Sequence, residues 1–379
     1  MARHLQEFVK VKPLVDYFIA LSTLDVFSGT PKSRLKIISL LVSHSFYSYF
    51  LYIHVKNSIH LEVNINLMWT FLVWILLSDY IAIMFLNIFK RKNFHVLLEN
   101  IKKMFEEEEE DEELGGILED RLMTTLRIFN FLNRWEIRLG VILTIFCGIN
   151  FRFNPDYGLT IEIPFIVSEH ILWQEGQYII QIIFGTVTAY NMMSINMAIS
   201  FLGLSIIAEF NILTDYMKVL NEKIKTDPKF FRKIIRRHCS FIENVDVINE
   251  IISESSFLQL FANCVIFLFG FSFVMRHSYT FANYMIIFAG LMLSIHVCVL
   301  GHILKMKTDR LSDSLYLTNW YDLSLDDQKT FLIILGMAQR EYGLKAAGMY
   351  DVNLYTIIQL SKIGFSYCAV LYSLSQSSQ

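Results

Sequence analysis

The chain has 379 residues and a net charge of −3, and 54% of its residues are hydrophobic while only 18% are charged. Soluble globular domains usually contain about 45–50% apolar and about 25% charged residues. The composition excludes a disordered chain, a collagen-like chain and a disulfide scaffold, and it disfavours an ordinary soluble enzyme. We therefore expect an all-α membrane protein.

Seven apolar runs follow one another along the chain and predict seven transmembrane helices. A bilayer core of about 30 Å requires about 20 apolar helical residues, and none of the runs alternates as the strands of a membrane β-barrel do. The third run is the weakest, because Asn150 and Arg152 stand near its end. No linker divides the chain, so residues 1–379 are predicted to form a single membrane domain. The runs lie near residues 36–55, 67–89, 137–153, 177–207, 257–275, 281–304 and 353–374.

Lys and Arg residues are distributed unequally over the segments that join these runs. The segments on one side contain 28 of them, and the segments on the other side contain 3. Because cytoplasmic loops are enriched in Lys and Arg, the N-terminus is predicted to be cytoplasmic, and seven spans then place the C-terminus outside the cell. A G-protein-coupled receptor has the opposite orientation, so the charge pattern disfavours that class.

Residues 208–256 form a cytoplasmic segment with a helical pattern of its own. Apolar positions recur at helical spacing on both sides of a basic stretch at 229–237. We expect the fourth and fifth spans to continue into the cytoplasm as paired helices that anchor the bundle. Their apolar faces contact either another subunit or each other, and the sequence leaves both readings open.

Residues 305–350 form a second anchor-like cytoplasmic segment. Ser324 and Asp327 have the spacing of a capping box, which predicts a helix over 325–343. Ala346-Ala347-Gly348 then breaks the chain before the last span. The last helix is therefore predicted to be split into a cytoplasmic half and a membrane half.

The acidic run at 106–113 (EEEEEDEE) is either a cation-attracting or docking surface, or a solvated helix end, and the second reading is favoured. Asp79 and His296 are ionisable residues within predicted spans. Asp79 is interpreted as a wetted position near the inner mouth rather than a pairing partner, and His296 as a hydrogen-bonded core histidine rather than a ligand. The sequence predicts no catalytic residues, because it lacks the usual hydrolase, zinc-protease and dinucleotide motifs.

The five cysteines have no metal-ligand spacing, so neither a metal site nor a cofactor is predicted. No basic stripe with interleaved aromatic residues is present, so nucleic acid is not an expected partner.

The C-terminal stretch 317–374 resembles the C-terminal signature of insect odorant receptors. The resemblance is specific over about 60 residues, and elsewhere it extends only to hydropathy, topology and loop size. The matching pieces are Asn319-Trp320-Tyr321, Leu323-Ser324, Ala338-Gln339-Arg340, Leu344-Lys345-Ala346-Ala347-Gly348, Asn353-Leu354 and Ser366-Tyr367.

This resemblance implies an odorant-gated, non-selective cation channel subunit in the plasma membrane of the sensory dendrite of olfactory neurons. Family members assemble as tetramers, and tuning subunits associate with a shared co-receptor subunit. The chain lacks the long insertion of the co-receptor between the fourth and fifth spans, which identifies it as similar to a tuning subunit. The expected partners are therefore the co-receptor, a small volatile ligand, membrane lipid and the permeating cations. The alternatives are a gustatory-type channel subunit and a metabotropic seven-span chemoreceptor.

In the family the membrane half of the last helix, here residues 352–376, lines the pore. Helical spacing places Ile363, Tyr367, Val370 and Leu374 on one face of it, and a ring of such side chains can close a pore by dewetting. Packing within the bundle is the alternative explanation of this face. The resemblance places Val370 and Leu374 at the gate.

A volatile ligand is expected among the outer halves of the second to sixth spans, in an aromatic-lined pocket with few polar groups. Tyr178, Thr186 and Tyr284 are the candidates to orient one polar group, and no fixed charge is evident, which favours a neutral ligand. For any single residue of this set, ordinary helix packing is the alternative. The predicted lining residues are Met68, Phe71, Leu72, Ile75, Ile145, Phe146, Ile149, Tyr178, Ile182, Thr186, Phe269, Phe273, Tyr284 and Phe288.

Overall fold

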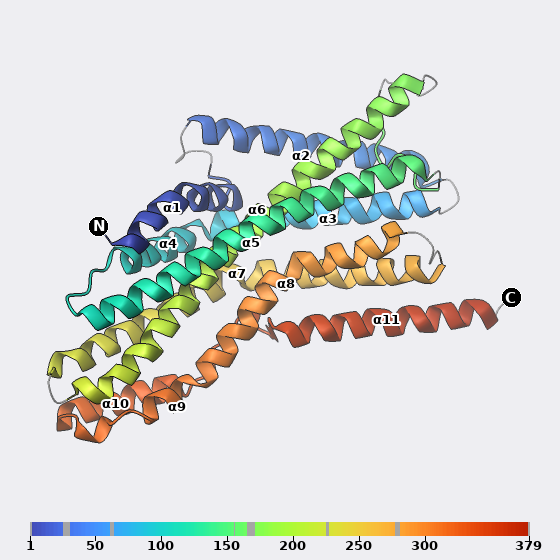
Figure 1. The fold of residues 1–379 in the computed structure, drawn as a ribbon. Coiled ribbons are helices and arrows are strands. Elements are labelled where there is room, and N and C mark those ends of the chain that lie inside the picture. Colours follow the sequence, from blue (N-terminus) through green and yellow to red (C-terminus); the bar gives the residue numbers. More distant parts are fainter. Residues whose placement is uncertain are drawn as a thin grey trace.

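A computed structural model describes residues 2–25, 31–60, 64–154, 156–164, 171–224, 227–276 and 281–377 (Figure 1). The described chain is helical apart from one short hairpin. Its helices are α1 (Arg3–Ser22), α2 (Pro31–Ser58), α3 (Ile65–Phe89), α4 (Arg91–Glu106), α5 (Glu112–Phe153), α6 (Ile171–Lys223), α7 (Pro228–Arg276), α8 (Phe281–Asp309), α9 (Leu311–Tyr316), the 3₁₀ turn η1 (Trp320–Asp322), α10 (Leu325–Ala338) and α11 (Leu354–Ser377). The antiparallel strands β1 (Lys345–Ala346) and β2 (Tyr350–Asp351) stand between α10 and α11.

Each predicted apolar run lies within a helix, namely α2, α3, α5, α6, α7, α8 and α11. Of the described helices, α3, α6, α7, α8 and α11 are long and apolar enough to cross a membrane. The apolar run of α5 is flanked by Glu136, Arg138 and Arg152, and α2 is diluted by serine, histidine and tyrosine, which explains why these two fall short. The prediction of an all-α membrane protein is confirmed, and the number of seven spans stays a prediction.

The helices α6 and α7 extend far beyond a bilayer, as the sequence predicts. With 53 and 49 residues and a rise of about 1.5 Å per residue, they are about 80 and about 74 Å long. Both helices run the length of the molecule (Figure 1). At one end of the bundle lies the C-terminus, and we call this the C-terminal end of the bundle. At the other end lie α9 and α10.

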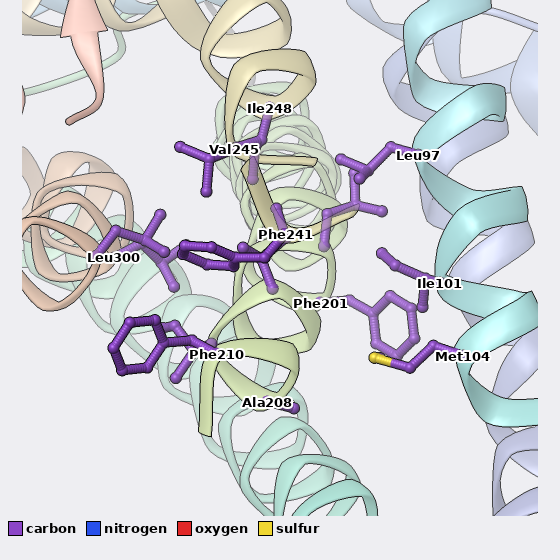
Figure 2. Close-up of a cluster of buried hydrophobic side chains, with 14 of the residues drawn as sticks. Leu97, Ile101, Met104, Phe201, Ala208, Phe210, Phe241, Val245, Ile248 and Leu300 are labelled. Carbon is purple, nitrogen blue, oxygen red and sulfur yellow. The ribbon is translucent and has the colours of Figure 1, made fainter. Parts of the chain in front are cut away.

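The main hydrophobic core lies where these long helices meet α4 and α8 (Figure 2). Phe201 of α6 and Phe241 of α7 are fully buried there, and Leu97, Ile101 and Met104 of α4 face them. Phe210 and Phe241 meet edge to face with their ring centroids 5.3 Å apart. The apolar positions at helical spacing in 208–256 therefore pack within the chain, as one of the two readings of this segment proposed.

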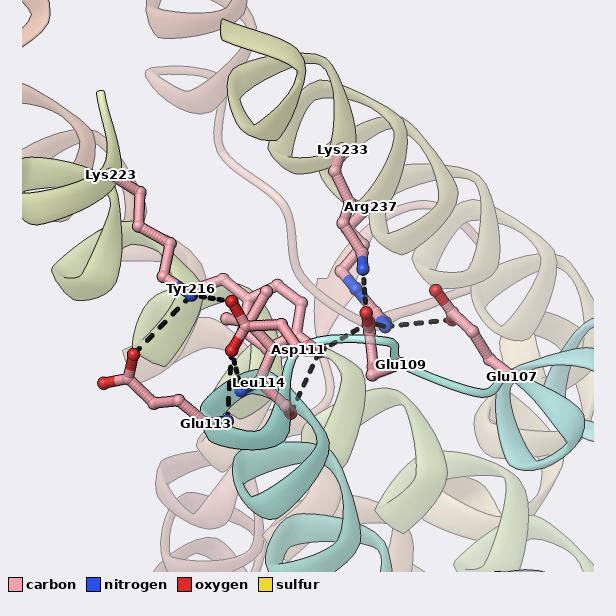
Figure 3. A network of polar contacts seen from close by, with 9 residues as sticks. All are labelled: Glu107, Glu109, Asp111, Glu113, Leu114, Tyr216, Lys223, Lys233 and Arg237. Carbon is pink, nitrogen blue, oxygen red and sulfur yellow. Dashed lines mark hydrogen bonds and ion pairs between the residues drawn. The ribbon is translucent and has the colours of Figure 1, made fainter. Parts of the chain in front are cut away.

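The acidic run, which connects α4 to α5, forms ion pairs with the basic stretch of α7 (Figure 3). Glu109 is 3% exposed in its side chain and pairs with Lys233 and Arg237, while Asp111 pairs with Lys223 of α6. Arg237 also donates to Glu107, with Nη2 and Oε2 2.9 Å apart. The run is a helix end and a connection, but five of its eight acidic side chains form ion pairs within the chain, namely Glu106, Glu107, Glu109, Asp111 and Glu113.

Burial alone would raise the pKa of the Glu109 carboxyl, but hydrogen bonds from Lys233 and Tyr216 and the charges of Lys233 and Arg237 hold that pKa below its ordinary value. A carboxyl whose pKa is lowered on folding stabilises the fold above its unfolded pKa of about 4.3. This contribution is lost as the pH falls through the lowered pKa. The network is thus at full strength at neutral pH.

We expect Tyr216→Phe to lower the free energy of unfolding by about 1.5–3 kcal/mol, which is typical of a hydrogen bond to a charged group. Tyr216 is fully buried, and its hydroxyl donates to Glu109 Oε1 at 2.7 Å. Thermal melting of the purified chain measures the effect. Tyr321→Phe removes an exposed hydroxyl and serves as the control. Equal melting temperatures of the two variants would contradict the importance of this hydrogen bond.

The predicted break before the last helix is a hairpin turn. Ala347 and Gly348 have φ values of +49° and +70°, and Met349 N donates to Ala346 O at 3.0 Å. Two successive positive φ values are typical of a type I′ turn, which joins two antiparallel strands tightly. Ser324 caps α10 through Asp327 N as predicted, but the helix ends at Ala338 and not at residue 343. The hairpin separates α10 from α11, so the last helix is split.

Candidate functional site: cavities in the helix bundle

A mostly apolar cavity lies toward the C-terminal end of the bundle, among α2, α3, α5 and α6. We call it the end cavity, and its volume is about 160 Å³. Trp69, Val73 and Phe151 provide an apolar lining, and Thr188 and Gln181 are among the few polar groups. Its lining also includes Tyr47, Leu76, Leu77, Thr144, Cys147, Gly148, Thr160, Ile182, Gly185 and Met192.

Hydrogen bonds hold residues 156–164 across this end of the bundle. Asn66 of α3 donates to the carbonyl oxygen of Leu159 at 2.7 Å, and Thr160 N donates to Gln181 Oε1 at 2.9 Å. Tyr157 Oη donates to Asn283 Oδ1 of α8 at 2.8 Å. Asn57 of α2 also donates to Glu162 Oε1 at 2.9 Å, so the segment is tied to four helices. Thr160 and Gln181 serve both in this closure and in the cavity lining.

An aromatic cluster stands beside the end cavity. Trp69 meets Phe151 edge to face at 5.0 Å between ring centroids, and it stacks on Phe273 at 6.0 Å. Tyr157 stacks on Phe151 at 5.3 Å. Each such pair stabilises the fold by about 0.5–1.5 kcal/mol beyond the contribution of its buried area. The cluster is therefore a well-packed part of the structure next to the end cavity.

Two further cavities continue from the end cavity into the bundle. The middle cavity, of about 130 Å³, lies among α3, α5, α6 and α8, and the small cavity, of about 30 Å³, lies beside Asp79 among α3, α6, α7 and α8. Leu76 and Met192 line all three cavities. These two side chains therefore separate the three spaces from one another.

The predicted ligand-binding residues do not line one cavity but lie in several different environments. Ile182 lines the end cavity. Leu72 and Phe273 are buried in the neighbouring aromatic cluster, with Met68 and Phe269 packed against it. Tyr178 is buried under the guanidinium of Arg152, and Ile75, Thr186 and Phe288 are partly buried. The remaining five are exposed in the single chain, namely Phe71, Ile145, Phe146, Ile149 and Tyr284.

The rotation of each helix about its axis decides which residues reach a cavity, and the sequence does not give this rotation. On α5 the cavity side is Thr144, Cys147, Gly148 and Phe151, one residue away from the predicted face. Gly148 is the residue in the sequence that could have indicated the face of α5 that packs against α6, because a Cβ there would lie 2.3 Å from Ile182 Cγ1. This glycine permits the close approach of α5 to α6 beside the cavity.

The predicted gate residues lie on an uncovered face of α11. Ile363, Tyr367 and Val370 are 58%, 56% and 57% exposed, and the side chain of Leu374 lies outside the described residues. On the neighbouring face Gly364 and Cys368 are buried, and Cys368 Sγ donates to the carbonyl oxygen of Leu268 on α7. Packing within the single chain therefore does not explain the predicted face.

A sequence model described as "7tm Odorant receptor" matches residues 61–365. The chain belongs to the odorant receptor family. This family consists of receptors, so the prediction that the protein is not an enzyme is confirmed, as is the predicted family itself. The protein is thus a multi-pass membrane protein of an odorant-binding family.

The chain is also similar to a Drosophila melanogaster protein and to a receptor of known structure. It is 23% identical to a Drosophila melanogaster protein described as odorant receptor 83c over 133 residues, which cover 35% of this chain and about a third (33%) of the relative. It also resembles the solved olfactory receptor OR5 of Machilis hrabei, with a TM-score of 0.66 and 13% identity over 96% of this chain and 99% of that one. The same receptor in complex with eugenol gives a TM-score of 0.70 and 13% identity over 97% and 100% of the two chains. These structural likenesses show the fold.

Proposed function

We propose that the odorant receptor is a tuning subunit of an odorant-gated, non-selective cation channel. The observation that carries this proposal is the mostly apolar end cavity in a receptor-family bundle. An apolar cavity with a few placed polar groups suits a small volatile molecule. The similar receptor solved with eugenol supports a small aromatic ligand of this kind.

The exposed face of α11 supports the channel part of the proposal. Isoleucine, tyrosine and valine side chains on a membrane helix require either lipid or a neighbouring subunit around them, and four such helices around one axis form an apolar constriction. In this proposal Val370 and Leu374 form the gate, α11 lines the pore, and the co-receptor supplies the other subunits of the tetramer. The N-terminus is cytoplasmic, and the receptor resides in the plasma membrane of the sensory dendrite.

Ligand binding opens the pore only through a difference in affinity between the two states. A ligand that fills the end cavity stabilises the conformation in which α11 has moved outward, and it shifts the equilibrium by that difference alone. Contacts of α11 with α7 and α8 connect the pore helix to the helices that surround the cavities.

Whole-cell current from cells that express this chain tests the proposal, with and without the co-receptor and against a panel of neutral volatiles. Current that appears within the odorant pulse, persists without GTP and requires the co-receptor is the expected result. A signal that depends on a G protein, without any such current at normal surface expression, would overturn the channel proposal.

We expect Met192→Ala to shift the preferred ligand toward larger volatiles. Met192 borders all three cavities, so its truncation joins them into one space, at a cost in stability of about 2–5 kcal/mol. Dose–response curves for a series of alcohols of increasing chain length measure the shift. Met104→Ala truncates a buried methionine in the core around α4, away from the cavities, and controls for lost stability. An unchanged order of preference would contradict the role of Met192 as a partition.

A further inference from the structure

Glu136 and His296 form an ion pair at the middle cavity. Glu136 Oε1 contacts His296 Nε2, and the side chains are 12% and 7% exposed. The carboxylate comes from α5 and the imidazole from α8, so the pair bridges two helices of the bundle. Such a pair within a membrane bundle is costly unless each polar atom is satisfied.

Both members of the pair retain an unused polar atom. Glu136 Oε2 and His296 Nδ1 are buried and have no hydrogen-bond partner among the described residues. Glu136 lines the middle cavity, and all other described lining residues are apolar, including Leu139, Leu143 and Met292. A buried acceptor without a partner beside an empty apolar space is unsatisfied until a donor enters that space.

The surroundings of the pair decide which donor fits. The carboxylate of Glu136 already contacts the imidazole of His296, and the other described lining residues are apolar, so a further charge buried there is strongly disfavoured. A cationic ligand is therefore disfavoured in this cavity. A neutral hydroxyl donates one hydrogen bond to Oε2 and adds no charge.

The size of the cavity sets the size of the ligand. A cavity of about 150 Å³ in another protein holds benzene, so the middle cavity, of about 130 Å³, accommodates a molecule of about six heavy atoms. Leu76 and Met192 separate this space from the end cavity, so a larger ligand does not fit in the middle cavity alone.

We propose that Glu136, held by His296, makes the middle cavity a recognition site for a small neutral alcohol or phenol. The inference rests on the proposed odorant receptor function and names the ligand class. This proposal differs from the prediction made from the sequence, in which no fixed charge was expected near the ligand. Glu136 accepts the ligand's hydroxyl proton in a hydrogen bond through Oε2, and the apolar side chains enclose the hydrocarbon part.

Three probes with one carbon skeleton test the ligand class: cyclopentanol, cyclopentanone and protonated cyclopentylamine. We would measure their stabilisation of the full-length chain, purified in lipid nanodiscs, by thermal unfolding over a concentration series. Cyclopentanol is expected to act at about tenfold lower concentration than cyclopentanone, since the ketone offers only an acceptor to the carboxylate. Equal action of alcohol and ketone, preference for the amine, or no binding of the alcohol would each overturn the inference, and the unmodified chain suffices for this test.

The double variant Glu136→Met/His296→Phe tests the residues. It removes both partners, which costs less stability than leaving one of them unpaired. The alcohol-to-ketone ratio is expected to fall to within about twofold. Glu110→Gln changes an exposed carboxylate outside the bundle and should keep the tenfold ratio. An unchanged ratio in the double variant would overturn the assignment to Glu136.

Current recordings with the same probes separate this inference from the proposed function. Alcohol-selective binding without any odorant-evoked current would support the recognition site and count against the channel. Odorant-evoked current with no preference for the alcohol over the ketone would support the channel and overturn the recognition site.

Discussion

Gly301→Ala is expected to lower the free energy of unfolding by more than about 4 kcal/mol, which is exceptional for a single methyl group. A Cβ at Gly301 would lie 1.9 Å from the carbonyl oxygen of Val352. That atom belongs to the backbone just before α11, so no side-chain rotation relieves the clash. The variant must displace either α8 or the segment that leads into α11.

The backbone around Val352 has little freedom to move. Val352 N donates to Leu344 O at 2.8 Å within the hairpin, and Ala347 N donates to Ser253 O of α7 at 2.9 Å. Lys305 of α8 and Asp351 of β2 pair at 2.6 Å. The hairpin is thus fixed between α7 and α8, and displacement of Val352 would break several of these contacts at once.

Surface expression and thermal melting measure the effect of Gly301→Ala. Gly336→Ala is the matched control, because Gly336 also lies within a helix but a Cβ there would meet no atom within 4 Å. Alanine is favoured over glycine in a helix by about 1 kcal/mol, so the control is expected to be neutral or slightly stabilising. Similar melting of both variants would show that α8 and the hairpin do not make this close contact.

The sequence predicted what depends on local pattern. Apolar runs predicted the helices, Ser324 and Asp327 predicted the start of α10, and Ala347-Gly348 predicted the break before α11. These features depend on hydrophobic periodicity and on backbone preferences that neighbouring residues decide alone.

The cavity lining could not be predicted, because it depends on how helices rotate against one another. Ile182 reaches the end cavity whereas Ile149 is exposed, although both follow the same spacing argument. His296 was expected to be hydrogen-bonded in the core, and its partner Glu136 lies 160 residues earlier on another helix. Pairing over such separations is a property of the tertiary fold. Closure of the acidic run by Lys233 and Arg237 is another example.

Replacing Val370 by alanine is expected to raise the current in the absence of odorant by at least about tenfold. If Val370 closes the pore, the closed state buries its two methyl groups against the neighbouring subunits. Their removal then costs roughly 1.5 kcal/mol per subunit, or roughly tenfold in the closed-to-open equilibrium. A narrower apolar side chain also weakens the dewetting that keeps ions out.

The control for this variant is Val42→Ala on α2. Val42 is 49% exposed and Val370 is 57% exposed, so both substitutions remove the same two methyl groups from uncovered helix faces. Only the substitution on α11 should change the current, because only α11 is proposed to line the pore. Whole-cell recording before odorant application, normalised to surface expression, gives the comparison. Closed-state current that matches the Val42→Ala variant would show that the exposed face of α11 is an interface with lipid or another subunit and that the gate lies elsewhere.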